Sequence, residues 1–212
     1  LPFNQLDPGT IWSKYIRYIG AGAVAAGGII SLIKTLPTMF RTFKSAIKGF
    51  GKNVSGGDRT QQDLPMSVVL IGSLVIAVGI WLIPEIPVSL LGALLIVVFG
   101  FFFATVSSRM VGIVGSSNNP VSGMAIATLI LTSFVLKATG STGSAGMLAA
   151  ISIGTVICII AAMAGDTSQD LKTGYIVGAT PVKQQIGELL GAVVAALTIG
   201  GVLYILSKAW GG

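Results

Sequence analysis

Long runs of apolar residues alternate with polar segments along the whole chain. Each run is close to the roughly 20 residues that an α-helix needs to cross a bilayer, although the fourth is shorter. The runs cover residues 18–36, 66–83, 88–106, 121–136, 145–164 and 186–206. The pattern predicts an all-α, polytopic transmembrane helix bundle of about six spans, forming a single membrane-embedded region over residues 1–212.

A polar break at residues 107–123, rich in Gly, Ser and Asn, separates the third run from the fourth. Non-helical backbone at membrane depth is tolerated only where protein or a water-filled cavity covers it. The break and the short run after it therefore predict one or two discontinuous or re-entrant segments. Asn119-Pro120 has the form of a helix N-cap followed by proline at the first helical position, and Thr180-Pro181 repeats that form.

A second polar segment, at residues 165–185, is predicted as a loop. It contains Asp166, Gln169 and Asp170, which would share one face if the segment were helical. A solvated loop would explain these charges equally well.

Glu188 stands at the start of the last apolar run, four residues after Gln184. An ionisable residue inside a membrane segment is costly, and in a transporter it often carries a proton. The alternative is an interfacial glutamate paired with Lys183 or Arg109.

Composition excludes several classes of protein. Hydrophobic residues make up 53% of the chain and charged residues 9%, and the mean hydropathy is +0.89. Because the chain has one cysteine, Cys158, and no histidine, it cannot assemble the usual zinc, copper or haem ligand sets. We therefore expect no metal site, no cofactor and, with no histidine to activate a serine or threonine, no enzyme activity.

Basic residues concentrate in segment 41–64, which holds Arg41, Lys44, Lys48, Lys52 and Arg59. The segment lacks a base-reading motif, so the net charge of +6 fits a cytoplasmic loop better than a nucleic-acid surface. Alternation then places Arg109, Lys172 and Lys183 on the cytoplasmic side of a cell (inner) membrane. Small residues at Gly187, Gly191 and Ala195, and at Gly100 and Ala104, predict close helix contacts.

Two groups of residues are candidates for function. Arg109 offers a planar fork of donors for a carboxylate, and helix N-termini near the polar segments could add backbone donors. The predicted solute-binding residues are Arg109, Ser116, Ser117, Asn118, Asn119 and Gln184. The predicted proton-coupling residues are Glu188, Asp166 and Asp170.

Three stretches, residues 109–124, 165–175 and 181–188, resemble prokaryotic members of the oligopeptide transporter (OPT) superfamily, which includes the yellow stripe-like metal-chelate transporters. The most specific is Gln169-Asp-Leu-Lys-Thr-Gly-Tyr175. The resemblance implies secondary active, proton-coupled transport of oligopeptides or metal chelates across a lipid bilayer. Because family members are longer, it also implies an interior portion that works with the remaining helices of a transporter. A channel-like pore and a structural membrane module without solute binding are the alternatives.

Overall fold

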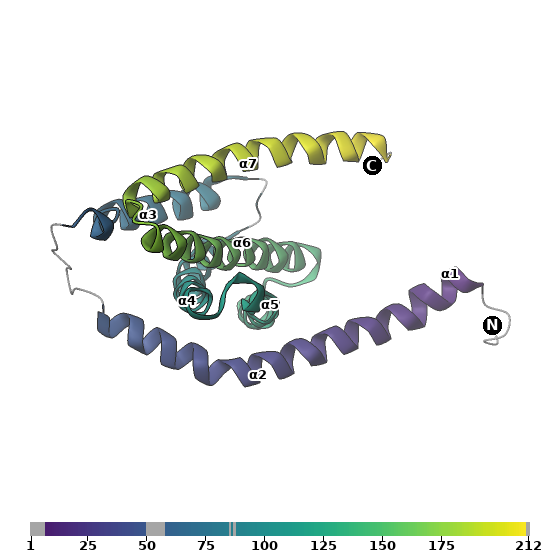
Figure 1. The fold of residues 1–212 in the computed structure, drawn as a ribbon. Coiled ribbons are helices and arrows are strands. Elements are labelled where there is room, and N and C mark those ends of the chain that lie inside the picture. The colour runs from purple at the N-terminus through teal and green to yellow at the C-terminus, as the bar shows by residue number, and fades with distance from the viewer. Residues whose placement is uncertain (1–6, 50–57, 85, 87, 211–212) are drawn as a thin grey trace.

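The computed structural model describes residues 7–49, 58–84, 86 and 88–210, and this part of the chain is helical without strands. The main helices are α1 (Pro8–Ile11), α2 (Arg17–Gly49), α3 (Met66–Leu82), α4 (Leu90–Val114), α5 (Val121–Ala138), α6 (Gly143–Ile176) and α7 (Pro181–Ala209). A π-helical turn, Trp12–Ile16, joins α1 to α2, and short 3-10 turns cover Arg59–Gln61 and Ser116–Asn118. The predicted all-α helix bundle is confirmed (Figure 1).

Five segments of the described chain are long and apolar enough to cross a membrane: Arg59–Leu82, Leu90–Val114, Val121–Ala138, Gly143–Ile176 and Pro181–Ala209. They correspond to five of the six predicted spans. The remaining one, residues 18–36, lies inside α2, where several side chains fall outside the description, and it stays a prediction.

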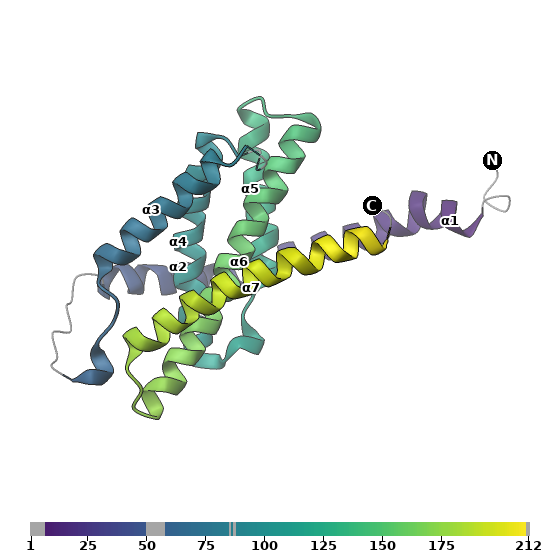
Figure 2. The same ribbon diagram turned by 90° about the horizontal axis from the view of Figure 1, so that it is seen from above.

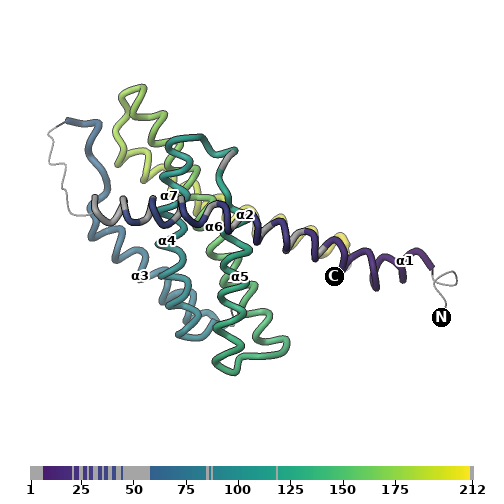
Figure 3. The backbone as a smooth tube through the Cα atoms, turned by 90° about the horizontal axis from the view of Figure 1, so that it is seen from below, coloured from purple at the N-terminus to yellow at the C-terminus, as the bar shows by residue number. Residues whose placement is uncertain are grey.

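The core lies between α4, α5 and α6, with α6 packed against both of the others. Its most buried apolar side chains include Val106, Met124, Ile153 and Ile157. On the outside, α2 runs along one side of this group and α7 along the opposite side (Figure 1), and α2 crosses α4 and α5 (Figure 3). No residue of α7 is buried, so α7 presents an apolar surface around most of its length.

The two predicted small-residue contacts have different outcomes. An ideal Cβ on Gly100 would lie 3.0 Å from Ile160 Cδ1, so α4 and α6 approach closely there. At Gly187 and Gly191 nothing lies within 4 Å of such a Cβ, and within the described chain no helix packs on that stripe of α7.

Both predicted polar breaks are shorter than expected. Within residues 107–123, α4 continues to Val114 and α5 begins at Val121, which leaves residues 115–120 between them. Within residues 165–185, α6 continues to Ile176 and α7 begins at Pro181, as the Thr180-Pro181 pair predicted. The predicted loop at 41–64 is also helical as far as Gly49, and residues 50–57 are not described. Because a helix satisfies its own backbone hydrogen bonds, it can continue through a polar stretch where a neighbouring helix provides partners for the polar side chains.

The connections between helices collect at two ends of the bundle (Figure 2). The α3–α4 and α5–α6 turns lie at one end, and the segment before α3, the α4–α5 connection and the α6–α7 turn lie at the other. Arg59 bonds the α6–α7 turn, and Lys172 and Lys183 lie in the helix ends on either side of it, so all three are near the second end. This arrangement matches the alternation predicted from the basic residues, and the side of the membrane stays a prediction.

We expect the end that carries residues 58–65 to face the cytoplasm, because lysine and arginine resist translocation. The expected result of cysteine-accessibility labelling in intact cells is that Ser141→Cys in the α5–α6 turn reacts with an impermeant reagent and Asp63→Cys does not. If only Asp63→Cys were labelled from outside the cell, the true orientation would be the opposite of the predicted one. The same alternation predicts that the turn at residues 84–87 lies outside the cytoplasm, and residues 85 and 87 of this turn are not described.

Candidate functional site

The α4–α5 connection is held to the bundle by the side chain of Asn119. Its Nδ2 donates to Ser107 Oγ at 2.7 Å and to the Ala161 carbonyl at 3.3 Å. Ser107 is fully buried, and its hydroxyl donates to the same Ala161 carbonyl at 2.5 Å. The amide lies over Gly165, where an ideal Cβ would be 2.5 Å from Asn119 Nδ2. Residues of α4, α6 and the connection thus form one buried polar contact.

The predicted N-cap at Asn119 is wrong. The helix α5 begins at Val121 with Pro120 in the N-cap position, and no side chain caps it. The Asn119 amide bonds to α4 and α6 instead, because Ser107 and the Ala161 carbonyl offer partners inside the bundle. Asn119 therefore holds the connection in place, and both amide hydrogens are engaged within the protein.

A matching contact joins α7 to the last turns of α6. Gln184 Nε2 donates to the Asp170 carbonyl at 3.2 Å, and a Cβ on Gly174 would overlap the Gln184 amide. In both contacts the amide lies on a glycine of α6 and donates to the carbonyl four residues before that glycine. In both, the amide oxygen is buried without a hydrogen-bond partner among the described residues. We call these the Asn119–Gly165 contact and the Gln184–Gly174 contact.

The end of α4 is capped by side chains of α6. Lys172 Nζ donates to the Gly112 carbonyl at 2.7 Å, where a cation also complements the negative end of the helix dipole. Ser168 Oγ donates to the Ser108 carbonyl at 2.6 Å. The segment predicted as a polar loop therefore fixes the position of the α4–α5 connection.

The turn between α6 and α7 is held by the segment before α3. Arg59 Nη2 donates to the Gly178 carbonyl at 2.7 Å, at a glycine whose φ of 75° ends α6. The backbone N–H of Val182 donates to the Gln62 carbonyl at 2.9 Å, and Leu64 N–H donates to a Gln185 side chain at 2.9 Å. These bonds fix the direction in which α7 starts.

A groove of about 470 Å³ lies between α4 and α6, beside the Asn119–Gly165 contact. Its lining combines apolar side chains with four hydroxyl groups. The lining residues are Phe101, Ala104, Thr105, Ser108, Ala164, Thr167, Ser168 and Leu171. A mostly apolar depression with a few polar groups is the usual form of a small-molecule site.

The predicted solute-binding residues are only partly brought together. Arg109 is exposed on α4, four residues after Thr105 of the groove and therefore on the same side of the helix. Ser116 uses its backbone N–H to bond Gln169 Oε1 at 2.8 Å, and Ser117 is exposed. The side chain of Asn118 lies outside the description. Gln184 lies at the α6–α7 contact, with α6 between it and Asn119.

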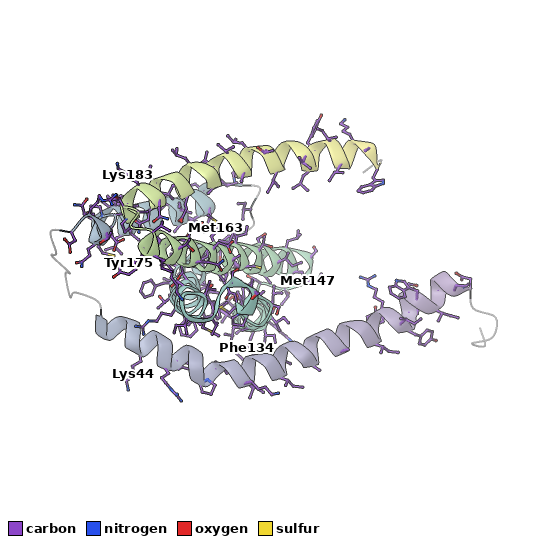
Figure 4. The ribbon with its side chains drawn as sticks, viewed as in Figure 1. Lys44, Phe134, Met147, Met163, Tyr175 and Lys183 are labelled. Atoms are coloured by element: carbon purple, nitrogen blue, oxygen red, sulfur yellow. The ribbon has the colours of Figure 1, made fainter. Side chains whose placement is uncertain are left out.

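The predicted proton-coupling residues also differ in environment. Asp166 and Asp170 are exposed on α6. Glu188 is half-buried, and its Oε1 has no hydrogen-bond partner among the described residues. The alternative pairing with Lys183 or Arg109 is not seen, since no ion pair joins Glu188 to a described side chain. Figure 4 shows Lys183 at the start of α7 near Tyr175, at the end of α6.

Sequence reasoning missed the hydroxyl residues of the groove and the role of Arg59. Thr105 and Ser108 stand three positions apart on the otherwise apolar α4, and this spacing is the signal that could have found them. Thr167 and Ser168 are adjacent residues of the polar stretch of α6, and no spacing signal marks them.

The five membrane-capable helices of the described chain define a multi-pass membrane protein. The model of the family described as "OPT oligopeptide transporter protein" matches residues 2–212, so the chain belongs to this family. A Haemophilus influenzae protein described as a candidate oligopeptide transporter is 32% identical over 95% of this chain, which covers 36% of that protein. A Saccharomyces cerevisiae protein with a similar description is 30% identical over 61% of the chain and 16% of its own length. No solved structure matches the chain.

Proposed function

We propose that this chain is part of a secondary active transporter that carries oligopeptides across the cell (inner) membrane, driven by protons. The observation that carries the proposal is the hydroxyl-lined groove between two membrane-capable helices of an OPT family member. Metal chelates are a second solute class, because amino-acid-derived chelators present carboxylates as peptides do. The chain spans about a third of the length of its Haemophilus influenzae relative, so transport is proposed for the whole transporter.

Arg109 binds the carboxylate of the solute in this proposal. A guanidinium stays charged when partly desolvated and matches a carboxylate with two parallel hydrogen bonds. Support comes from its exposure, from the absence of an ion-pair partner among the described residues, and from its position one turn beyond Thr105 of the groove. The hydroxyl oxygens of the groove would accept hydrogen bonds from peptide N–H groups, because the hydroxyls of Thr105, Ser108 and Ser168 already donate to helix carbonyls.

In this proposal Glu188 carries the coupled proton, and Asp166 and Asp170 are the alternative candidates for that role. Support for Glu188 comes from its half-buried position on a membrane-capable helix. The two aspartates are exposed on α6, so Glu188 is the most shielded of the three carboxylates. A proton bound at Glu188 would neutralise its charge, so that the side chain could lie inside the membrane during the transport cycle at a lower energetic cost.

Uptake by cells that express the full-length protein tests the proposal. We expect labelled peptide or iron chelate to accumulate against its gradient, and a protonophore to abolish the accumulation. A channel-like pore would equilibrate the solute without accumulation, and a structural module would take up none. Either result would contradict the proposal.

Arg109→Ala is expected to weaken solute binding by tenfold or more, since a hydrogen-bonded charge contributes about 1.5–3 kcal/mol. Equilibrium binding of labelled solute to the purified full-length protein measures the change. Arg41→Ala is the matched control, because it removes an exposed arginine from α2, away from the groove. Equal affinity in the two variants would reduce Arg109 to a topology determinant.

A further inference from the structure

The hydroxyl groups that line the groove between α4 and α6 use their protons within the protein. Thr105 Oγ1 donates to the Phe101 carbonyl at 2.8 Å, and Ser108 Oγ donates to the Thr105 carbonyl at 3.4 Å. Ser168 Oγ donates from α6 to the Ser108 carbonyl of α4 at 2.6 Å. A carbonyl oxygen cannot donate, so the hydroxyl is the donor in each pair. These three hydroxyls therefore offer a solute lone pairs, which accept hydrogen bonds.

The direction of the Ser168 hydroxyl is fixed by the packing of the two helices. Its oxygen occupies space that a glycine of α4 leaves open, since an ideal Cβ on Gly112 would lie 3.0 Å from it. Turning its proton toward a solute would remove the bond that joins α6 to the Ser108 carbonyl. The groove is therefore built to bind donors rather than acceptors.

The described residues that line the groove carry no charge. A charged group that leaves water for such a lining has no partner there, which is costly. A carboxylate also needs hydrogen-bond donors, and the protons of three lining hydroxyls are already engaged. Metal chelators made from amino acids carry several carboxylates, whereas the backbone of a peptide brings N–H donors without charge between its two ends. The lining thus favours a peptide over a metal chelate.

The length of the lining sets how much of a peptide it can hold. The lining extends over residues 101–108 of α4 and 164–171 of α6. At 1.5 Å per residue, each stretch is about 10 Å long. An extended peptide rises about 3.3 Å per residue, so about three of its residues match this length.

We propose that the groove binds about three residues of an extended peptide with neutral side chains, whose backbone N–H groups donate to the hydroxyl oxygens of the lining. This inference rests on the proposed transport function and narrows its two solute classes to peptides. Arg109, one turn beyond Thr105, holds the terminal carboxylate outside the uncharged lining. The side chains of the peptide contact the apolar residues of the lining, which are Phe101, Ala104, Ala164 and Leu171.

Thr105→Val in the full-length protein removes one hydroxyl and keeps the shape of the side chain. We expect it to weaken equilibrium binding of trialanine about fivefold, because one hydrogen bond to the peptide is lost. An ester analogue of trialanine, in which oxygen replaces both amide N–H groups, should bind equally well to the wild type and to the variant. A purely structural role of Thr105 would not distinguish the two ligands.

Thr155→Val is the matched control. Thr155 Oγ1 also donates to the carbonyl four residues before it, at 2.9 Å from Ile151, and it lies on α6 outside the groove lining. It should leave the binding of both ligands unchanged. Equal affinity of the wild type and Thr105→Val for trialanine would overturn the inference. An equal loss of affinity for trialanine and its ester analogue would overturn it too, since Thr105 would then act through the fold.

Competition for uptake separates this inference from the proposed function. In cells that express the full-length protein, we expect unlabelled trialanine to block uptake of labelled trialanine and ferric citrate, a carboxylate-rich chelate, to leave it unchanged. Uptake that a protonophore abolishes, but that ferric citrate blocks as well as trialanine does, would overturn the inference and leave the proposed function standing. Selective binding of trialanine without proton-driven accumulation would do the reverse.

Discussion

Gly165→Ala is expected to destabilise the protein by about 2 kcal/mol, despite the general preference of helices for alanine. A Cβ at this position would lie 2.5 Å from Asn119 Nδ2, 3.0 Å from Val111 Cγ2 and 3.1 Å from Ser107 Oγ. Overpacking of this kind costs about 1–3 kcal/mol. Displacing Asn119 would also remove two hydrogen bonds of about 1 kcal/mol each, against a gain of about 1 kcal/mol in helix propensity.

The matched control is Gly191→Ala on α7, where nothing lies within 4 Å of the added Cβ. It makes the same chemical change in a helix and should leave stability unchanged or raise it. Thermal unfolding of the full-length protein in detergent compares the two variants with wild type. If Gly165→Ala were as stable as Gly191→Ala, the Asn119–Gly165 contact would contribute little to holding the α4–α5 connection.

The sequence predicts the presence of the helices better than it predicts where they end and which residues cap them. Runs of apolar residues correctly located five membrane-capable segments, because length and hydropathy are local properties. The start of α7 at Pro181 was also local, since proline fits the first turn of a helix. Both features can be predicted from a short stretch of sequence, without knowing which other parts of the chain pack against it.

The boundaries that failed depend on partners far along the chain. Residues 165–176 look like a loop because of their charges, yet Lys172 caps α4 and Ser168 bonds its last turn. Asn119 looked like an N-cap because no local signal reveals that Ser107 and Ala161 lie beside it. Tertiary partners outweighed local propensity at each of these places.

The same reasoning separates the candidate sites. Arg109 was predicted from its chemistry, and its position near the groove came only from the structure. Glu188 was predicted from the energetic cost of a charge within an apolar run, a signal that the local sequence contains. Gly165 and Gly174 could not be recognised as sites of amide packing, because the amides that lie on them come from the α4–α5 connection and from α7.

Glu188→Gln is expected to abolish accumulation driven by a pH gradient in the full-length protein while solute binding is retained. Glutamine cannot release a proton, so the driving force is uncoupled from the solute. Glutamine has the size and shape of glutamate, and the Gln184 bond to the Asp170 carbonyl does not involve residue 188, so the variant should fold. Uptake under an imposed pH gradient, set beside equilibrium binding of the same solute, measures the two effects separately.

Asp58→Asn is the matched control, because it replaces an exposed acid by its amide just outside α3 and should accumulate solute like wild type. Undiminished proton-driven accumulation in Glu188→Gln would remove Glu188 from the mechanism. The search would then move to Asp166→Asn and Asp170→Asn, which lie on the exposed side of α6. Loss of binding as well as accumulation in Glu188→Gln would instead mean that the carboxylate contacts the solute, since the amide keeps the size of the side chain but not its negative charge.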